Sequence, residues 1–254
     1  MENFERIRAI EYATARAFPG IEHQMVHGWL LRAGDGITER SNSAAPLEPE
    51  AWEKPLPLAP IEAFYHAHGL APQVLVPDEL GVKATGLLDE GWVAGPEIMT
   101  LYRDLHDVVV PVKKGYYCRF SAQPCRNWLD MYHFRGKPLP LSALNLLRSS
   151  IDGEMIFASL CADSGKTVAI TRGTLTADHR GNWWLGYSAV EVHPDYRQRG
   201  LGTLLGLQVL DWGARKGASH AYLQVLASNE AGRALYERLE FEKSHAHRYF
   251  SNPS

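Results

Sequence analysis

A short turn that contains two glycines is the part of this sequence best suited to chemistry. It covers residues 197–203 and reads Arg-Gln-Arg-Gly-Leu-Gly-Thr. Residues 183–193 have the pattern of a strand, and apolar residues from Leu201 onward recur at helical spacing. Because the first N–H groups of a helix lack partners inside it and lie at the positive end of its dipole, such a turn can hold an anion. Gly200 and Gly202 would let a phosphate approach the backbone closely. The sequence therefore predicts a phosphate-binding turn.

The composition is that of an ordinary soluble globular protein. The 254 residues are 45% hydrophobic and 22% charged, and a net charge of −3 gives no reason to expect nucleic acid or an anionic membrane as the main partner. There is no apolar leader and no run of about 18 apolar residues. Cys118, Cys125 and Cys161 lie too far apart for a compact zinc signature, and their odd number argues against a disulfide framework. We therefore expect a cytoplasmic protein without a metal.

The elements that must position the turn can be read from periodicity and from Gly and Pro signals. In the first half we predict helices at 3–18, 61–68 and 80–90. Strands are predicted at 23–33, 37–45, 73–77 and 96–102, with a hairpin turn at 34–36 and a proline-rich loop at 46–60. In the second half, helices are predicted at 127–134, 141–151, 201–216 and 230–239. Strands are predicted at 116–121, 154–161, 167–176, 183–193 and 220–226, with a last edge strand at 247–250. Antiparallel strands followed by a βαβ unit indicate an α/β fold with a mixed sheet.

The two halves follow a similar plan, which indicates an internal repeat. A hairpin, a helix, a short apolar strand, a second helix and a further strand occur after residue 23 and again after residue 167. The first copy has prolines where the second has the glycine turn. We place a boundary at Lys113-Lys114-Gly115 and predict a degenerate lobe at 1–112, serving as a scaffold or substrate wall, and a second domain at 115–254.

The segment around the turn resembles the GNAT acetyltransferase superfamily. In that family an apolar strand leads into Arg/Gln-x-x-Gly-x-Gly/Ala at the start of a helix, and Arg197, Gly200 and Gly202 occupy these places. The resemblance is clear over residues 115–250 and faint in the first half. It implies a GNAT fold with a mixed, mainly antiparallel twisted sheet flanked by helices. It also implies two GNAT-like lobes, of which the first is degenerate and the second, 115–254, is the catalytic domain.

A second match follows about 30 residues later. Asn229-x-x-Gly232-x-x-Leu235-Tyr236 resembles the family helix Asn-x-x-Ala-x-x-Leu-Tyr, which ends in Gly-Phe. Here Gly232 replaces Ala, and Glu240 replaces the glycine before Phe. Both departures concern helix packing and capping.

The resemblance implies acetyl-CoA as cosubstrate, with its pyrophosphate held by backbone N–H groups of the turn. The residues concerned are Arg197, Gln198, Arg199, Gly200, Leu201, Gly202 and Thr203. In the family the strand before the turn splays away from the next strand, here 220–226, and the pantetheine arm inserts between them. Backbone groups of Val190 and Val192 would pair with the arm, an N–H near Val192 would polarise the thioester carbonyl, and Asn229 would hydrogen-bond the arm.

Two side chains are the candidates for proton transfer. Tyr236 matches the family's general acid beside the sulfur. Since thiols titrate near pH 8.5 and phenols near pH 10, Tyr236 would act mainly by hydrogen-bonding the developing thiolate. Glu191 is the carboxylate best placed to deprotonate the amine, directly or through water, with Tyr187 and His193 on the same strand as alternatives. Each of these three fits an ordinary strand or turn position equally well.

The acceptor is predicted less sharply. Three arginines fall in elements that line the acceptor side of GNAT enzymes and suit a carboxylate: Arg119, Arg126 and Arg172. Segments 27–33 and 38–44 resemble two-lobed actinobacterial GNAT proteins, some of which are assigned as N-acetylglutamate synthases. The polar residues of the second segment join the candidates: Arg40, Ser41 and Asn42.

Together these residues predict an acetyl-CoA-dependent N-acetyltransferase that transfers acetyl directly to the primary amine of a small molecule, such as the amino acid glutamate. Cys161 has no evident His partner, which argues against a covalent intermediate. The alternative is a non-catalytic acyl-CoA-binding sensor or scaffold. A nucleotide site ranks last because the chain has no Gly-Lys-Ser/Thr. A homodimer is compatible with the prediction, and the sequence leaves the oligomeric state open.

Overall fold

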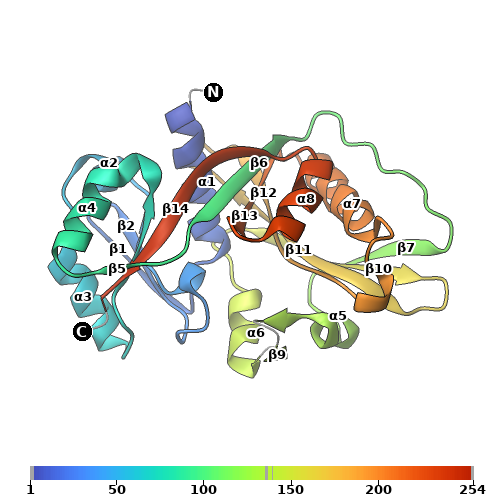
Figure 1. The fold of residues 1–254 in the computed structure, drawn as a ribbon, viewed down its shortest axis with the longest axis horizontal. Coiled ribbons are helices and arrows are strands. Elements are labelled where there is room, and N and C mark those ends of the chain that lie inside the picture. Colours follow the sequence, from blue (N-terminus) through green and yellow to red (C-terminus); the bar gives the residue numbers. More distant parts are fainter. Residues whose placement is uncertain (1–2, 135–136, 139, 253–254) are drawn as a thin grey trace.

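The computed structural model describes residues 3–134, 137–138 and 140–252, and its centre is a nine-stranded sheet. The strands lie in the order β4-β14-β6-β13-β12-β11-β10-β7, and the short β5 pairs with β14. All neighbouring strands in this sheet are antiparallel except β12 and β13, which are parallel. The predicted α/β fold with a mixed, mainly antiparallel sheet is confirmed (Figure 1).

The helices and strands have the following bounds. The helices are α1 Asn3–Ala17, α2 Pro49–Glu53, α3 Leu58–Ala67, α4 Gly81–Asp89, α5 Arg126–Met131, α6 Leu141–Leu147, α7 Leu201–Arg215 and α8 Glu230–Arg238. The strands of the large sheet are β4 Gln73–Pro77, β5 Val93–Ala94, β6 Ile98–Asp104, β7 Tyr116–Ser121, β10 Glu154–Ala162, β11 Thr167–Ala177, β12 Trp183–Val192, β13 His220–Leu226 and β14 Glu242–Ser251. Two smaller sheets contain β1 Glu22–Val26, β2 Trp29–Ala33 and β3 Ala45–Pro46, and β8 His133–Phe134 with β9 Lys137–Pro138.

Helices cover both faces of the sheet around β12. On one face, α7 and α8 bury their apolar side chains with Leu185 of β12 and with alternate residues of β10, β11 and β13. On the other face, α1 packs on Trp184 of β12 and Tyr222 of β13. Trp128 of α5 packs on Phe157 and Ile170 on this second face too. Because successive side chains of a strand point to opposite faces, Trp184 and Leu185 belong to different layers.

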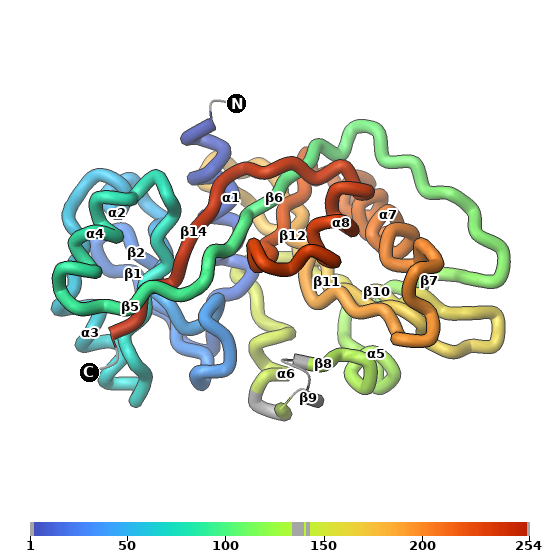
Figure 2. Tube along the Cα trace, in the orientation of Figure 1, coloured from blue at the N-terminus to red at the C-terminus, as the bar shows by residue number. Residues whose placement is uncertain are grey.

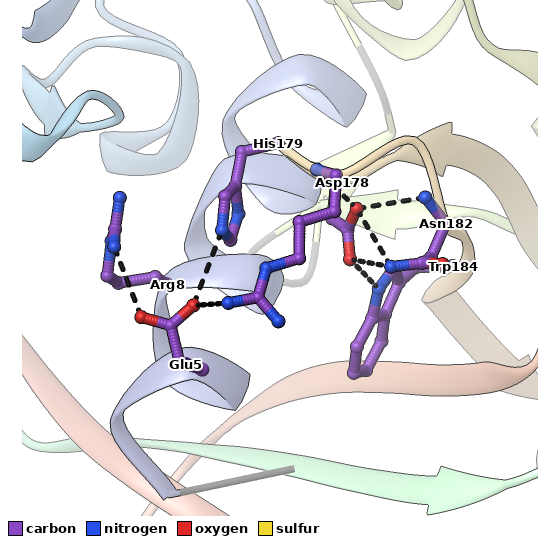
Figure 3. Close-up of polar contacts among 7 residues, drawn as sticks. Glu5, Arg8, Asp178, His179, Asn182 and Trp184 are labelled. Carbon is purple, nitrogen blue, oxygen red and sulfur yellow. Dashed lines mark hydrogen bonds and ion pairs between the residues drawn. The ribbon is translucent and has the colours of Figure 1, made fainter.

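The first turns of α1 are anchored to the connection between β11 and β12 by ion pairs (Figure 3). The Glu5 carboxylate lies 3.2 Å from Arg8 and 3.7 Å from the ring of His179, and it also accepts a hydrogen bond from Arg180. The helix formed by the first residues of the chain is therefore attached to the second half.

The same connection is ordered by Asp178. Its carboxylate accepts hydrogen bonds from the backbone N–H groups of Arg180 and Asn182 at 2.8 and 2.9 Å, and from the indole N–H of Trp184 at 3.1 Å (Figure 3). Burial by itself raises the pKa of Asp178, but these hydrogen bonds outweigh it, so the pKa of Asp178 is lowered. An ionised Asp178 thus sets the register of β11 and β12.

The large sheet extends across the boundary that we predict at 113–115. Strand β6 comes from the first half, yet it pairs along its length with β13 on one side and with β14 on the other. Residues 105–115 then run from β6 to β7, which lies at the far edge of the sheet (Figure 2). A smaller apolar core, made by β2, β4 and helices α2 to α4, lies at the other end of the molecule. The division into residues 1–112 and 115–254 stays a prediction.

The hairpin of the first half turns earlier than its sequence predicts. The predicted strand 23–33 is two paired strands, β1 and β2, joined by His27 and Gly28 with φ of 46° and 80°. Two consecutive residues with positive φ form the tight turn that matches the twist of a hairpin. The predicted turn at 34–36 is present as well, since the Ile37 N–H donates to the Gly34 carbonyl at 3.2 Å and Asp35 and Gly36 have φ of 53° and 67°, but it does not lead directly into a strand. The predicted strand 37–45 shortens to β3 because residues 39–41 form a 3-10 turn. Part of the predicted loop 46–60 is helical, as α2.

The last strand is also longer and more central than predicted. We expect an edge strand at 247–250, but β14 covers Glu242–Ser251 and lies between β4 and β6. Its interior position brings β14 against α1.

Candidate active site

The predicted strands before and after the turn do splay apart. Strands β12 and β13 pair only from Trp184 opposite His220 to Gly186 opposite Tyr222. Beyond that point β12 continues against β11, and β13 continues against β6. The facing edges of the two strands therefore hold backbone N–H and C=O groups without a strand partner, which an extended ligand could use.

A β-bulge on β12 increases the divergence. Ile170 of β11 pairs with Glu191 and Arg172 pairs with Ser188, so two residues of β12 oppose one of β11. One of the two, Ala189, has a positive φ of 54°. A bulge bends the bulged strand and increases its twist, which turns the end of β12 away from β13.

The turn itself presents backbone donors to solvent. Gln198 and Gly200 have φ of 58° and 71°, and α7 begins after Gly200. Among the described residues, none of the N–H groups from Gln198 to Thr203 donates to a protein acceptor. Successive N–H groups in this kind of conformation form a concave anion site. The side chain of Arg197 donates to the carbonyl of Val192 at 3.1 Å, which ties the turn to the end of β12.

The two glycines of the turn have different roles. Gly200 is exposed and left-handed, and a Cβ there would meet no heavy atom within 4 Å. Gly202 is buried, and its Cβ would contact Leu235 and Val192 at 3.4 Å. The missing side chain at Gly202 therefore allows α8 and β12 to pack against α7. That a phosphate approaches the backbone at Gly202 stays a prediction.

Helix α8 is capped by the residue expected to bind the pantetheine arm. The side-chain oxygen Oδ1 of Asn229 accepts a hydrogen bond from the Gly232 N–H at 2.9 Å, so Asn229 is the N-cap. A Cβ at Gly232 would lie 2.7 Å from the Asn229 amide nitrogen, which explains why the alanine of the family pattern is absent. Glu240, in the place of the family glycine, has φ of 59° and pairs with Arg103 at 3.1 Å.

Tyr236 lies where α8 meets the end of β12. Its ring is 6.2 Å from the ring of Tyr187 and 6.1 Å from that of Phe241, and it packs with Val190 and Val192. Burial raises the pKa of Tyr236 to about 12, although the positive charge of Arg40 lowers it. The phenol is therefore neutral at physiological pH and can donate a hydrogen bond.

Glu191 points to the opposite face of β12. It lines a cavity of about 510 Å³ together with Asp130, Met131, His133, Val192, His193, Pro194 and Arg197. Burial raises the pKa of Glu191, while the charges of Arg197 and His133 lower it. Because residues 190 and 192 pack toward α8, a group inserted between β12 and β13 would have Tyr236 on one face and Glu191 on the other.

The alternative bases are placed less favourably. The His193 ring nitrogen accepts from the Asp195 N–H at 3.3 Å, so His193 caps the turn that ends β12. Tyr187 is buried in the core beside Gly206, and burial raises its pKa far above the physiological range.

The three candidate acceptor arginines separate into two groups. Arg119 and Arg126 are exposed, and they contact Tyr117 and Asp130 respectively. Arg172 is fully buried, and its terminal nitrogen donates to the carbonyls of Ala17 and Ser149 at 3.2 and 3.0 Å. Its other two guanidinium nitrogens are buried and have no hydrogen-bond partner among the described residues.

Arg172 shares an aromatic ring with Arg40 of the first half. Both guanidinium groups lie 4.7 Å from the ring centroid of Phe18. Burial lowers the pKa of Arg172 to about 10, so it is still protonated at neutral pH. Ser41 and Asn42 are buried, and the Asn42 amide bonds the backbone of Gly34 and Thr38, which is a structural role. Of the predicted acceptor residues, the structure thus brings together Arg40 and Arg172.

Further polar groups line the sheet face that α1 covers. We call these the polar face: buried side chains of β11, β12 and β14 that include atoms without a hydrogen-bond partner in the described part of the chain. These atoms belong to Arg172, Thr174, Ser188, His247 and Tyr249. The positive charge of Arg40 acts on His247 and Tyr249 as well as on Tyr236. The sequence analysis missed most of this set, although alternating polar residues within apolar strands (172, 174, 176 and 245, 247, 249) are a signal of it.

The sequence and the fold were then compared with known proteins. Residues 5–250 match the family described as "Probable histone acetyltransferase Rv0428c C-terminal". The chain is 34% identical over 244 residues to "Probable histone acetyltransferase Rv0428c" of Mycobacterium tuberculosis, covering 96% of this chain and 73% of that protein. It is 25% identical to "Uncharacterized N-acetyltransferase YobR" of Bacillus subtilis, covering 96% and 97%. The fold resembles a GCN5-related N-acetyltransferase from Kribbella flavida, with a TM-score of 0.68, 19% identity and coverage of 97% and 95%. Within the described residues, no helix has the length and apolar character needed to span a membrane.

Proposed function

Because this chain belongs to the Rv0428c C-terminal family of the GNAT superfamily and is an acetyltransferase, we propose that it transfers acetyl from acetyl-CoA directly to the primary amine of a small molecule. The observation that carries the proposal is the divergence of β12 from β13 beside a turn with free N–H groups. An extended thioester with a phosphate tail fits both features. The competing assignment, a sensor that binds acyl-CoA without turnover, gives no role to Tyr236 at that divergence.

The donor would be held mainly by backbone groups. N–H groups of the turn, from Gln198 to Thr203, would bind the pyrophosphate, each charge-assisted bond contributing about 1.5–3 kcal/mol. Val190 and Val192 would pair with the pantetheine amides, and the side-chain amide of Asn229 would donate to the same arm. The free N–H groups of the turn and the unpaired edge of β12 support this assignment.

Transfer would form a C–N bond and break a C–S bond in one displacement. Glu191 would take the proton of the attacking amine, directly or through a water in its cavity. An N–H near Val192 would stabilise the charge that develops on the carbonyl oxygen. Tyr236 would donate a hydrogen bond to the leaving thiolate; with its pKa at about 12, the phenol keeps its proton against a thiol near 8.5, and solvent completes protonation.

The acceptor would carry an anionic group, as an amino acid such as glutamate does. Arg40 and Arg172, which both lie over the ring of Phe18, support this class. A carboxylate would pair with guanidinium donors, and two nitrogens of Arg172 have no other partner in the described part of the chain. The first lobe, residues 1–112, would then contribute Arg40 and α1 as a wall of the acceptor site rather than a second donor site.

Thiol release from acetyl-CoA over an amine panel tests this function. The panel contains glutamate, its α-amide and γ-ester, neutral amino acids, polyamines and a lysine peptide. We expect turnover with carboxylate-bearing amines. The rate should be lower for each glutamate derivative in which one carboxylate is blocked. Turnover confined to polyamines or peptides would overturn the acceptor class. Tight acetyl-CoA binding by calorimetry, without thiol release from any amine, would instead indicate the sensor.

A further inference from the structure

A cluster of titratable side chains that includes His247 of the polar face contains none of the residues to which the proposed transfer assigns a step. Glu11, His245 and His247 are buried, and each offers one ligand atom such that all three atoms lie within 4.8 Å of one another. Glu11 is far from the two histidines in the sequence and meets them because β14 is an interior strand that packs against α1.

The positions of the three residues on β14 and α1 explain why their side chains lie together. His245 and His247 are two residues apart on β14, so their side chains lie on the same face. Glu11 is on the side of α1 that is buried with Ile7 and Ile10. A carboxylate on an apolar helix face has a large desolvation cost unless it is paired. Glu11 is paired with His245, whereas the guanidinium of Arg32 donates to Ser43 and to the Phe18 carbonyl.

The two imidazole rings are oriented by hydroxyl groups. The Nδ1 atom of His245 lies 3.1 Å from the Ser244 hydroxyl, and Nδ1 of His247 lies 3.3 Å from that of Thr100. Nε2 of His245 lies 2.8 Å from the Glu11 carboxylate. Nε2 of His247 is buried and has no partner in the described part of the chain. In metal-ligating histidines, one ring nitrogen is typically held by a hydrogen bond while the other binds the metal. His245 and His247 have this arrangement.

We propose that Glu11, His245 and His247 bind a divalent transition-metal ion, with Zn²⁺ the best fit. Two imidazoles and one carboxylate match the ligand preference of Zn²⁺, whereas Mg²⁺ and Ca²⁺ prefer oxygen ligands alone. Two ligand atoms on a tetrahedral zinc at ~2.0 Å lie about 3.3 Å apart, so the Glu11–His245 contact opens by only a few tenths of an ångström. The ion would link α1 to β14 beneath the polar face.

The charge of a neighbouring arginine affects how tightly this site would bind a metal ion. Arg32 is buried, and its positive charge acts on both Glu11 and His247. That charge opposes a second cation. We therefore expect an affinity below that of closed four-ligand zinc sites.

Metal content and cobalt titration of the full-length, tag-free protein test the site. Protein from zinc-supplemented medium is expected to retain about one equivalent of zinc after gel filtration. After chelation, Co²⁺ should produce the visible absorption of a tetrahedral site, Zn²⁺ should displace it, and both ions should raise Tm. Less than about a tenth of an equivalent of zinc, with no cobalt band and no shift in Tm, would overturn the proposal.

Variants assign the ligands. His247→Gln and Glu11→Gln should each lower zinc content at least tenfold. His220→Gln is the matched control, because His220 pairs with Asp104 at 2.9 Å but belongs to no three-residue ligand cluster in the described part of the chain; zinc content should be unchanged. Equal zinc loss in the control, or none in the ligand variants, would contradict the assignment. Where a ligand variant does not fold, the titration of the unmodified protein decides alone.

Discussion

The donor side and the acceptor side of this protein are built in opposite ways. The donor side is a stretch of seven consecutive residues, 197–203, whose binding groups are backbone N–H and whose surface is largely exposed. The acceptor side is a set of buried side chains that comes from residues 18 and 40 and from strands β11, β12 and β14. The first can be read along the chain, and the second exists only when the sheet is assembled.

This difference has an energetic consequence. Exposed N–H groups are solvated when no ligand is bound, so the unoccupied turn has little desolvation cost. Buried guanidinium and hydroxyl groups without partners each cost about 1–3 kcal/mol. The polar face therefore gains more from a ligand that pairs with these groups. We expect the donor side to accept any acyl-CoA and the acceptor side to determine specificity.

The largest effect should come from the residue at the junction of the two sides. Tyr236→Phe removes the hydrogen bond to the leaving thiolate and should lower kcat about a hundredfold, within the range of general acid–base groups. Affinity for acetyl-CoA should change less than about twofold, since the ring stays packed on Phe241. Steady-state thiol release and calorimetry measure the two quantities. Tyr196→Phe is the control, and an unchanged kcat in Tyr236→Phe would remove this residue from the mechanism.

Glu191→Gln should separate proton transfer from binding. We expect kcat/KM for the amine to fall roughly thirtyfold at pH 8. In the unmodified enzyme this rate should also fall as the pH drops through the pKa of Glu191, because the base must be ionised. That limb should lie above the ordinary value of 4.5, since burial raises the pKa. The pH profile of Glu191→Gln should lose the limb. Asp130→Asn, in the same cavity, should keep it, and a limb that persists in Glu191→Gln would assign the base elsewhere.

Arg40→Met tests whether the first lobe contributes to acceptor recognition. Loss of one charge-assisted hydrogen bond should raise KM for a carboxylate-bearing amine about tenfold and leave KM for acetyl-CoA unchanged. Arg119→Met is the matched control, because this arginine also stacks on an aromatic ring but is exposed on β7. Equal effects of the two substitutions would show that Arg40 acts only through general electrostatics.

The smallest effect should come from the conformation of the donor turn. Gly200→Ala forces a Cβ into a left-handed conformation at a cost of about 1 kcal/mol, which should weaken acetyl-CoA binding about fivefold. Gln198→Gly relieves strain at the other left-handed position and should leave the affinity unchanged or slightly higher. Calorimetry checks both. Gly200→Ala with unchanged affinity would mean that the turn does not hold the pyrophosphate.

Local patterns predicted the second half of the chain well. Strand β13 begins and ends at the predicted residues 220 and 226, and β10, β11 and β12 agree within a residue or two. The first half was predicted less well because its turn chemistry is unusual. The turn at Gly34, Asp35 and Gly36 was predicted correctly, but the tight hairpin turn at His27 and Gly28 was missed, because a residue other than glycine seldom takes a left-handed conformation.

The residues of the candidate site differ in the same way, because some follow from local sequence and others only from the assembled structure. Tyr236 and Gly200 belong to motifs of closely spaced residues, so their neighbourhood follows from the helix and turn that contain them. Arg172 was one of three equivalent arginines in the sequence, and only its burial beside Phe18 distinguishes it. Gly202 was predicted from its place in the turn, and only the structure shows that a Cβ there would contact Leu235, because this direction depends on how α8 sits on α7.

The sequence by itself determined the donor turn, the helices on either side of the sheet and the acetyltransferase family, since these depend on neighbouring residues and on the helical and strand periods. Only the tertiary structure decided what meets across the sheet. Strand β6 pairs with β13, and β14 pairs with the other edge of β6, far from their neighbours in the chain. That strand order brings Glu11 together with His245 and His247. Strand pairing is non-local, and its partners are set by the burial of whole faces rather than by any short pattern.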